Sequence, residues 1–119
     1  MAAGLSGFDR NNAILAAGLV GFALNLDPVR ILATDRSPRP VAKARQVAMY
    51  LSYAGFGMSL ARVAAAFRRD RSTVAHGCRL VEDRRDDPAF DAWMLTLEEG
   101  LQVLLEIGPD AKPNQPGVV

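Results

Sequence analysis

The two side chain types most often used in catalysis or metal binding occur once each, at His76 and Cys78. Together with Asp70, they could in principle exchange protons with a substrate. Acid–base catalysis would also need a nucleophile or a second histidine in a pocket, and a zinc site would need three or four ligands. The sequence offers neither set, so we expect no catalytic site, no metal and no cofactor. Contact with a partner molecule is the preferred interpretation of His76.

The basic residues, mostly arginine, are concentrated in one segment of the chain. The whole chain carries a net charge of +1, but residues 36–85 contain eleven basic and three acidic residues, a net charge of +8. From residue 86 onward, seven acidic residues face a single lysine. The planar guanidinium group suits phosphate oxygens and guanine edges better than an ammonium group does. A polyanionic partner is therefore indicated, although charge alone leaves a solvated basic surface as the alternative.

The length and composition predict a single domain with a real hydrophobic core. A chain of 119 residues, half of them hydrophobic, can bury such a core. No apolar stretch approaches the roughly 18 to 20 residues that a membrane-spanning helix needs. Polar residues at positions 9–12 precede the first apolar run, which is not typical of a signal peptide. A single cysteine cannot form an internal disulfide. We therefore expect a cytoplasmic protein without a membrane segment.

Helical spacing of apolar residues recurs along the chain, which predicts an all-α, compact multi-helix domain over residues 11–108. Residues 1–10 are expected to be flexible. Asn11 or Asn12 is predicted to cap a first helix ending near Ala23. Asp27 and Pro28 favour a short second helix through Leu32. The predicted apolar stripe of the first helix consists of Ile14, Leu15, Leu19 and Phe22.

Prolines at positions 38 and 40 interrupt helical structure and predict a basic loop around Arg36 and Arg39. A third helix is expected over residues 41–54, ended by Gly55 and Gly57. Lys43 and Arg45 lie near its start. Its predicted core face consists of Val47, Tyr50, Leu51 and Ala54.

Two short helices joined by a tight turn are predicted over residues 59–84. Ser59 can cap the first, whose buried stripe is formed by Leu60, Val63, Ala64 and Phe67. The charged residues 68–70 break the apolar period, which resumes with Val74, Cys78 and Val81. Cys78 is therefore interpreted as a small core residue, with redox sensing as the alternative.

A last helix is predicted over residues 88–107, closed by Gly108 and Pro109 and followed by a disordered tail over residues 109–119. It has more apolar residues than one face can hide, so contact with a partner is expected in addition to core packing. Its apolar residues are Phe90, Trp93, Met94, Leu97, Leu101, Leu104 and Leu105.

The second helix of the predicted helix-turn-helix has a small, polar and basic outward face. If Asp70 caps it, the first turn presents Arg71, Ser72 and Thr73, and the face opposite the apolar stripe adds His76 and Arg79. Such a face fits the major groove of double-stranded DNA, because arginine can bridge guanine acceptors and small residues let the backbone approach. Arg68 and Arg69 in the turn are expected to contact phosphates.

Residues 42–82 resemble the C-terminal DNA-binding domain of the bacterial replication initiator DnaA. Two blocks carry the resemblance. The first is Ala44-Arg45-Gln46-Val47-Ala48-Met49-Tyr50-Leu51; the second begins with Ser59-Leu60 and Phe67 and continues as Arg69-Asp70-Arg71-Ser72-Thr73-Val74-Ala75-His76-Gly77-Cys78-Arg79-Leu80-Val81-Glu82. With the preceding helices, which look like the family's connector and basic loop, the resemblance covers about three quarters of the chain.

The resemblance implies that the helix-turn-helix enters the major groove and that the basic loop places an arginine in the minor groove. It also implies that Arg45, Leu60, Ala61 and Asp70 lie near the DNA backbone or base edges. The full set of predicted DNA-binding residues is Arg36, Arg39, Lys43, Arg45, Leu60, Arg68, Arg69, Asp70, Arg71, Ser72, Thr73, His76 and Arg79.

Two positions depart from the family pattern. Arg71 replaces a histidine, which exchanges a contact suited to thymine for one suited to guanine, so a changed target sequence is expected. Leu80 replaces a lysine, which removes an expected phosphate contact and favours help from a protein partner. No Gly-x-x-x-x-Gly-Lys-Ser/Thr loop occurs in the chain, so we do not expect it to initiate replication alone.

The favoured function is that of a sequence-specific transcriptional regulator. We expect an activator that works with RNA polymerase or a sigma-like factor, as in activators of gene transfer agent clusters. One alternative is a replication regulator that competes with DnaA for origin sites. The other is an adaptor that binds a protein through its acidic C-terminal helix. The sequence leaves the target site, the sign of regulation and the oligomeric state open.

Overall fold

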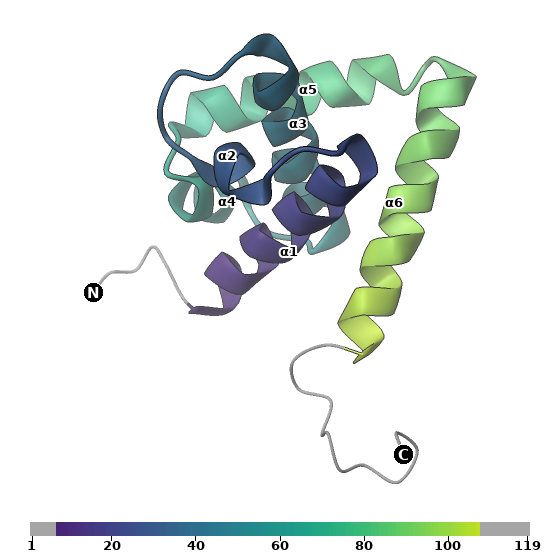
Figure 1. The fold of residues 1–119 in the computed structure, drawn as a ribbon, viewed down its shortest axis with the longest axis horizontal. Helices are drawn as coiled ribbons and strands as arrows, with labels where there is room; N and C mark the ends of the chain where they lie inside the picture. The colour runs from purple at the N-terminus through teal and green to yellow at the C-terminus, as the bar shows by residue number, and fades with distance from the viewer. Residues whose placement is uncertain (1–6, 108–119) are drawn as a thin grey trace, which may run out of the picture.

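The structure, a computed structural model, describes residues 7–107 and contains helices but no strand within that range. This confirms the all-α fold predicted from the sequence. The helix α1 (Gly7–Leu24) lies at the front of the molecule in Figure 1, with α5 (Arg71–Arg84) across the top and α6 (Pro88–Ile107) descending beside α1. No helix within the described range is long and apolar enough to cross a bilayer.

The first helix begins earlier than predicted and buries a different face. It starts at Gly7, so the predicted flexible start is wrong for residues 7–10, as is the predicted cap at Asn11 or Asn12; residues 1–6 lie outside the described range. Of the predicted stripe, Ile14 is exposed and Phe22 is 88% exposed. The buried face consists instead of Asp9, Asn12, Ala13, Ala16, Ala17, Val20 and Gly21. Its small side chains allow α1 to pack directly against its neighbours.

The short helix α2 (Pro28–Leu32) begins as predicted, since Asp27 Oδ1 accepts a hydrogen bond of 3.0 Å from the Val29 amide. After the loop of residues 33–38 comes α3 (Arg39–Tyr50). This helix begins two residues before the predicted start at Val41, because Pro40 lies in its first turn, where its missing amide donor would have no partner within the helix.

The predicted third helix does not continue regularly to Ala54. Residues Leu51–Gly55 form a π-helical segment, η1, closed by a hydrogen bond of 3.2 Å from the Phe56 amide to the Leu51 carbonyl. The wider turn changes the direction of the residues that follow it. Tyr50 and Leu51 are buried as predicted, but Ala54 is exposed, so its predicted core position is wrong. Gly55 lies so close to α6 that an added Cβ would be 2.6 Å from Leu101 Cδ2.

The helix-turn-helix has the predicted bounds. It consists of α4 (Leu60–Phe67) and α5, and Ser59 caps α4 by accepting a hydrogen bond of 3.2 Å from the Arg62 amide. The underside of α5, formed by Val74, Cys78 and Val81, is buried as predicted.

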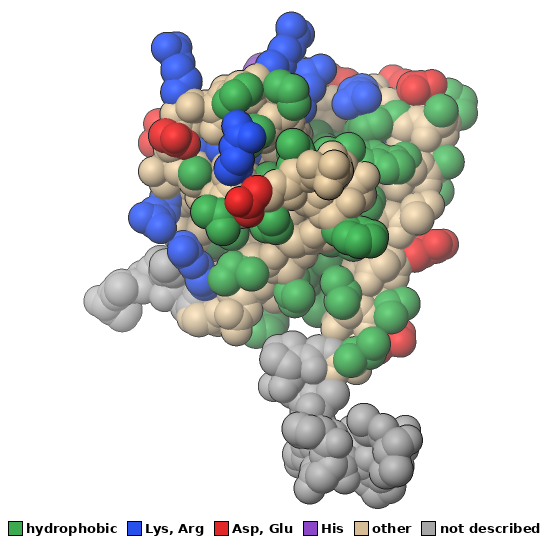
Figure 2. Space-filling model, viewed as in Figure 1, with side chains coloured by type: hydrophobic (Ala, Val, Ile, Leu, Met, Phe, Trp, Pro, Cys, Tyr) green, Lys and Arg blue, Asp and Glu red, His purple; other side chains and the backbone are tan. Residues whose placement is uncertain are grey.

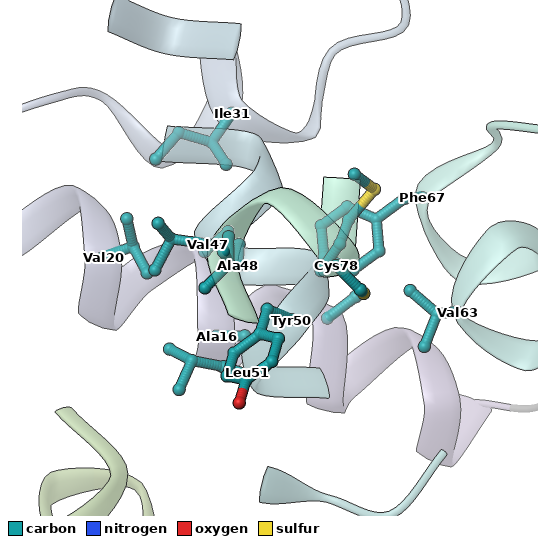
Figure 3. Close-up of a cluster of buried hydrophobic side chains, with 14 of the residues drawn as sticks. Ala16, Val20, Ile31, Val47, Ala48, Tyr50, Leu51, Val63, Phe67 and Cys78 are labelled. Carbon is teal, nitrogen blue, oxygen red and sulfur yellow. The ribbon is translucent and has the colours of Figure 1, made fainter. Parts of the chain in front are cut away.

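The core joins the helix-turn-helix to the first three helices. In Figure 3, side chains of α1, α2, α3 and η1 meet those of α4 and α5 in one cluster. The labelled residues are Ala16, Val20, Ile31, Val47, Ala48, Tyr50, Leu51, Val63, Phe67 and Cys78. Because one core supports both short helices, the orientation of the helix-turn-helix is set by the whole domain.

The last described helix, α6, has the predicted bounds and only part of the predicted core. Phe90, Met94, Leu97 and Leu101 are buried, and Trp93 and Leu104 are half-buried. Leu105 is exposed, which agrees with the expectation that one face of this helix cannot hide all of its apolar residues. The predicted closing residues Gly108 and Pro109 and the predicted disordered tail lie outside the described residues.

A candidate nucleic-acid interface

The turn between α4 and α5 is made by Arg68 in the left-handed backbone region. Its φ is 56° and its ψ is 49°, and its amide donates to the carbonyls of Ala64 and Ala65. An L-residue pays roughly 1 to 2 kcal/mol for this conformation, in which helices commonly end with glycine. The Arg68 side chain is exposed. The turn therefore presents a cation at the start of the second helix.

The first turn of α5 is exposed, as the predicted site requires. Arg71, Ser72 and Thr73 all point away from the core, whereas Val74 is completely buried. Asp70 occupies the N-cap position, but its side chain makes no capping hydrogen bond, which corrects the predicted capping role. Its exposed carboxylate lies at the positive end of the helix.

Farther along α5, His76 and Arg79 are also exposed, and they lie on the same side as the first turn. Gly77 faces the opposite way, against α3, where an added Cβ would lie 3.2 Å from Gln46 Cγ. The missing side chain lets α3 support α5 from beneath. The outward face of α5 is thus held on a rigid base.

The basic loop and the start of α3 add further exposed cations. Arg36 lies in the loop, Arg39 at the first position of α3 and Lys43 one turn later, and all three are exposed. Leu60 is half-buried at the start of α4, and Ala61 is exposed. Figure 2 shows Lys and Arg side chains gathered along the top and left of the view, the side on which α5 and α2 lie.

Arg45, one of the predicted DNA-binding residues, is turned into the protein. It is only 6% exposed, and its Nε donates to the Ile31 carbonyl at 2.8 Å. Its Nη2 donates to the Arg30 carbonyl at 3.0 Å and to Ser37 Oγ at 2.9 Å. Burial, followed by the nearby Arg69 guanidinium, lowers the pKa of Arg45, and Asp35 opposes this effect. Arg45 therefore positions the loop from within.

Arg69 is half-buried and also turned toward the loop. Its Nη2 donates to the Ala33 carbonyl at 2.8 Å, and a longer contact of 3.5 Å reaches the Asp35 carbonyl. Sequence reasoning missed this role for both arginines, because only the tertiary path of the chain brings them to their acceptors in the final turn of α2 and in the loop that follows it.

Two other arginines of the basic segment are neutralised by ion pairs. Arg62 Nη2 lies 2.6 Å from Asp9 Oδ1, and Arg85 binds both Asp91, at 2.6 Å, and Glu98, at 2.8 Å. The basic charge available at the surface is therefore smaller than the sequence count. Six predicted site residues are exposed cations that form no ion pair within residues 7–107: Arg36, Arg39, Lys43, Arg68, Arg71 and Arg79.

Two titratable residues beneath the interface, Cys78 and Tyr50, are buried in the core. Burial raises the pKa of the Cys78 thiol to about 11, so the thiol stays protonated near neutral pH. Burial, together with a hydrogen bond of 2.5 Å to Glu82, raises the pKa of Tyr50 to about 12. Within residues 7–107, no group of three His, Cys, Asp or Glu side chains could hold a metal ion.

Comparisons with known proteins match this part of the chain. The family model described as the bacterial dnaA protein helix-turn-helix matches residues 19–81, from within α1 to within α5. The chromosomal replication initiator protein DnaA of Lachnoclostridium phytofermentans is 42% identical over 59 residues, which is 48% of this chain. The aligned part is only 13% of that protein's length. No solved structure matches the chain.

Proposed function

Since the chain belongs to the family of bacterial DnaA helix-turn-helix domains, we propose that it is a sequence-specific regulator of transcription that binds double-stranded DNA. The family match supports binding to DNA. Recognition of a particular sequence, activation of transcription and a cytoplasmic location on the chromosome are parts of the proposal. The aligned 59 residues are 13% of the matched initiator's length, so the activity of that whole protein is not part of the proposal.

The observation that carries the proposal is the exposed first turn of α5. Arg71 can reach the N7 and O6 acceptors of guanine, and the hydroxyl groups of Ser72 and Thr73 can bond to bases or phosphates. The exposed cations of the turn and loop lie around this face and suit the phosphates on either side. No catalytic role is proposed for any of these residues.

Selection of bound sequences from a random duplex library tests sequence recognition directly. We expect enrichment of a short site in which at least one guanine is essential, and affinity that falls steeply with salt. Five or six phosphate contacts would reduce affinity by about a thousandfold between 50 and 200 mM salt. Binding without enrichment of any sequence would contradict a sequence-specific regulator.

A protein partner is proposed to contact α6. Leu95 and Val103 are 48% and 51% exposed, one above the other with Glu99 between them. Figure 2 shows hydrophobic side chains over α1 and α6, away from the basic side. Such a surface could serve RNA polymerase or a sigma-like factor while α5 occupies DNA.

A role in replication is the second candidate, favoured by the name of the matched relative. Mapping of chromosomal occupancy in the native host separates the two. Peaks upstream of genes whose transcripts change on deletion support regulation of transcription, whereas peaks confined to the replication origin support competition with DnaA.

The third candidate is an adaptor that does not use DNA, favoured by the acidic and apolar surface of α6. It predicts that the purified protein fails to bind any duplex at low salt. Retention of the selected duplex by the wild type, weakened in Arg71→Ala, would exclude this candidate.

A further inference from the structure

The loop between α2 and α3 carries Arg36, and its central residues are not held by backbone hydrogen bonds. Among the described residues, no backbone–backbone hydrogen bond involves residues 34–37. Holding one irregular arrangement of such a segment costs conformational entropy for every residue in it. Apart from a hydrogen bond of 3.4 Å from Ser37 Oγ to the Asp35 carbonyl, the side-chain hydrogen bonds that fix its path come from other elements.

One of these side chains is Arg45, which reaches the loop from α3. Through its Nε and Nη2 it binds the carbonyls of Ile31 and Arg30 in the final turn of α2, and the Arg30 carbonyl also accepts a hydrogen bond of 3.3 Å from the Ala33 amide. The same Nη2 binds Ser37 Oγ at the far end of the loop. Arg45 thus joins both ends of the loop.

The other is Arg69, which reaches the middle of the loop from the helix-turn-helix. It lies directly before the N-cap residue of α5 and binds the carbonyls of Ala33 and Asp35 in the first half of the loop. Asp35 is followed directly by Arg36. Arg69 therefore connects the position of Arg36 to the N-terminus of α5.

The placement of Arg45 and Arg69 is unfavourable in two respects, which indicates that their hydrogen bonds to the loop have a role beyond packing. Arg45 is buried close to the guanidinium of Arg69, and Arg69 Nε is buried without a hydrogen-bond partner among the described residues. Desolvated like charges and an unpaired donor are both unfavourable. The hydrogen bonds that Arg45 and Arg69 donate to α2 and the loop offset these unfavourable interactions.

We propose that Arg69, supported by Arg45, is a positioning residue that fixes the Arg36 loop relative to α5, so that Arg36 and Arg71 engage one duplex in a single register. This inference rests on the proposed DNA-binding function. It replaces the direct phosphate contact expected of Arg69 from the sequence with an indirect role.

A double-mutant cycle on duplex affinity separates the two roles. The four proteins are the wild type, Arg69→Met, Arg36→Ala and the double variant, with Arg68→Met as the matched exposed control. We expect Arg69→Met to weaken binding about tenfold in the wild type and hardly at all once Arg36 is replaced, because the loop then has no contact to position. Arg68→Met should cost the same in both backgrounds. Additive losses for Arg69 would overturn the proposal.

The conservative variant Arg69→Lys distinguishes a direct phosphate contact from a positioning role. Lysine keeps the positive charge needed for a phosphate but lacks the guanidinium fork. We expect Arg69→Lys to weaken binding nearly as much as Arg69→Met. Full affinity in Arg69→Lys would indicate a direct phosphate contact and would overturn the positioning role.

A measurement without DNA tests the positioning role of Arg69 independently of DNA binding. Backbone ¹⁵N relaxation of the unbound protein should give order parameters near 0.85 for residues 34–37 in the wild type and below about 0.6 in Arg69→Met. Residues of α5 and the Arg68→Met control should be unchanged. Unaltered loop order in Arg69→Met would refute the positioning role. Failure of the wild type to bind any duplex would instead refute the proposed function.

Discussion

Arg68 and Arg71 lie on either side of the helix N-terminus, both exposed, and different contacts are expected of them. Arg68 belongs to the turn, where it can meet phosphates of any sequence. Arg71 is the first residue of α5, where it can reach a base edge. Arg68 is therefore expected to contribute affinity for any DNA, and Arg71 is expected to contribute sequence specificity.

Arg71→Ala is expected to cost about 1 to 3 kcal/mol of binding free energy on the selected site and to relax the base preference at one position. Arg68→Ala should weaken binding to specific and random duplexes alike and lower the slope of log affinity against log salt by about one. Fluorescence anisotropy with both duplexes at several salt concentrations measures these effects. Equal losses on both duplexes for Arg71→Ala would contradict its role in base recognition.

Arg68→Gly is expected to stabilise the fold while it weakens DNA binding. Glycine adopts the left-handed region without strain, so the free energy of unfolding should exceed that of Arg68→Ala by about 1 kcal/mol. Both variants lose the same charge and should bind duplex equally weakly. Urea denaturation and anisotropy on the two proteins provide the comparison; equal stability would show that the turn is unstrained.

At the scale of the elements, an ion pair fixes α4 against α1. Arg62 Nε and Nη2 bind the two carboxylate oxygens of Asp9 at 3.0 and 2.6 Å. The Asp9 side chain is almost completely buried, whereas Arg62 is half-exposed. The hydrogen bond from Arg62 lowers the pKa of Asp9, with burial acting in the opposite direction.

This pair predicts a pH dependence of stability. Because the pKa of Asp9 is lower in the folded state, its contribution is fully present above the unfolded value of about 3.9 and is lost as the pH falls through the folded value. Asp9→Asn should lower the free energy of unfolding at pH 7 by about 1 to 2 kcal/mol and should lose less than the wild type below pH 4. Urea denaturation between pH 2.5 and 7 tests this; parallel curves would contradict the assignment.

Across the whole molecule, charge and apolar surface are separated. Exposed cations surround α5 and the loop, whereas α6 contains four acidic residues and no basic residue. Arg85 holds the two regions together, since it binds Asp91 and Glu98 of α6 and donates to Tyr50 Oη at 3.2 Å. The molecule can therefore present α6 to a protein while α5 faces DNA.

The double variant Leu95→Ser/Val103→Ser tests this division. Both side chains are already about half exposed, so duplex affinity should stay within twofold of the wild type and the fold should remain intact. We expect regulation of a reporter gene carrying the selected site to be lost. Arg71→Ala should lose both duplex affinity and regulation. Unimpaired regulation by the double variant would remove α6 from the proposed partner surface.

The sequence by itself determined the all-α fold, the bounds of α5 and α6, and the exposed polar face of α5. These features depend on periodic spacing and local capping, which short stretches of sequence carry. The buried face of α1 was mispredicted, because close packing favoured its alanines over its larger side chains. Only the tertiary structure decided which arginines are engaged within the protein: Arg45, Arg62, Arg69 and Arg85 bind groups 14 to 53 residues away in the chain. Partners so far apart meet only once the whole core has formed.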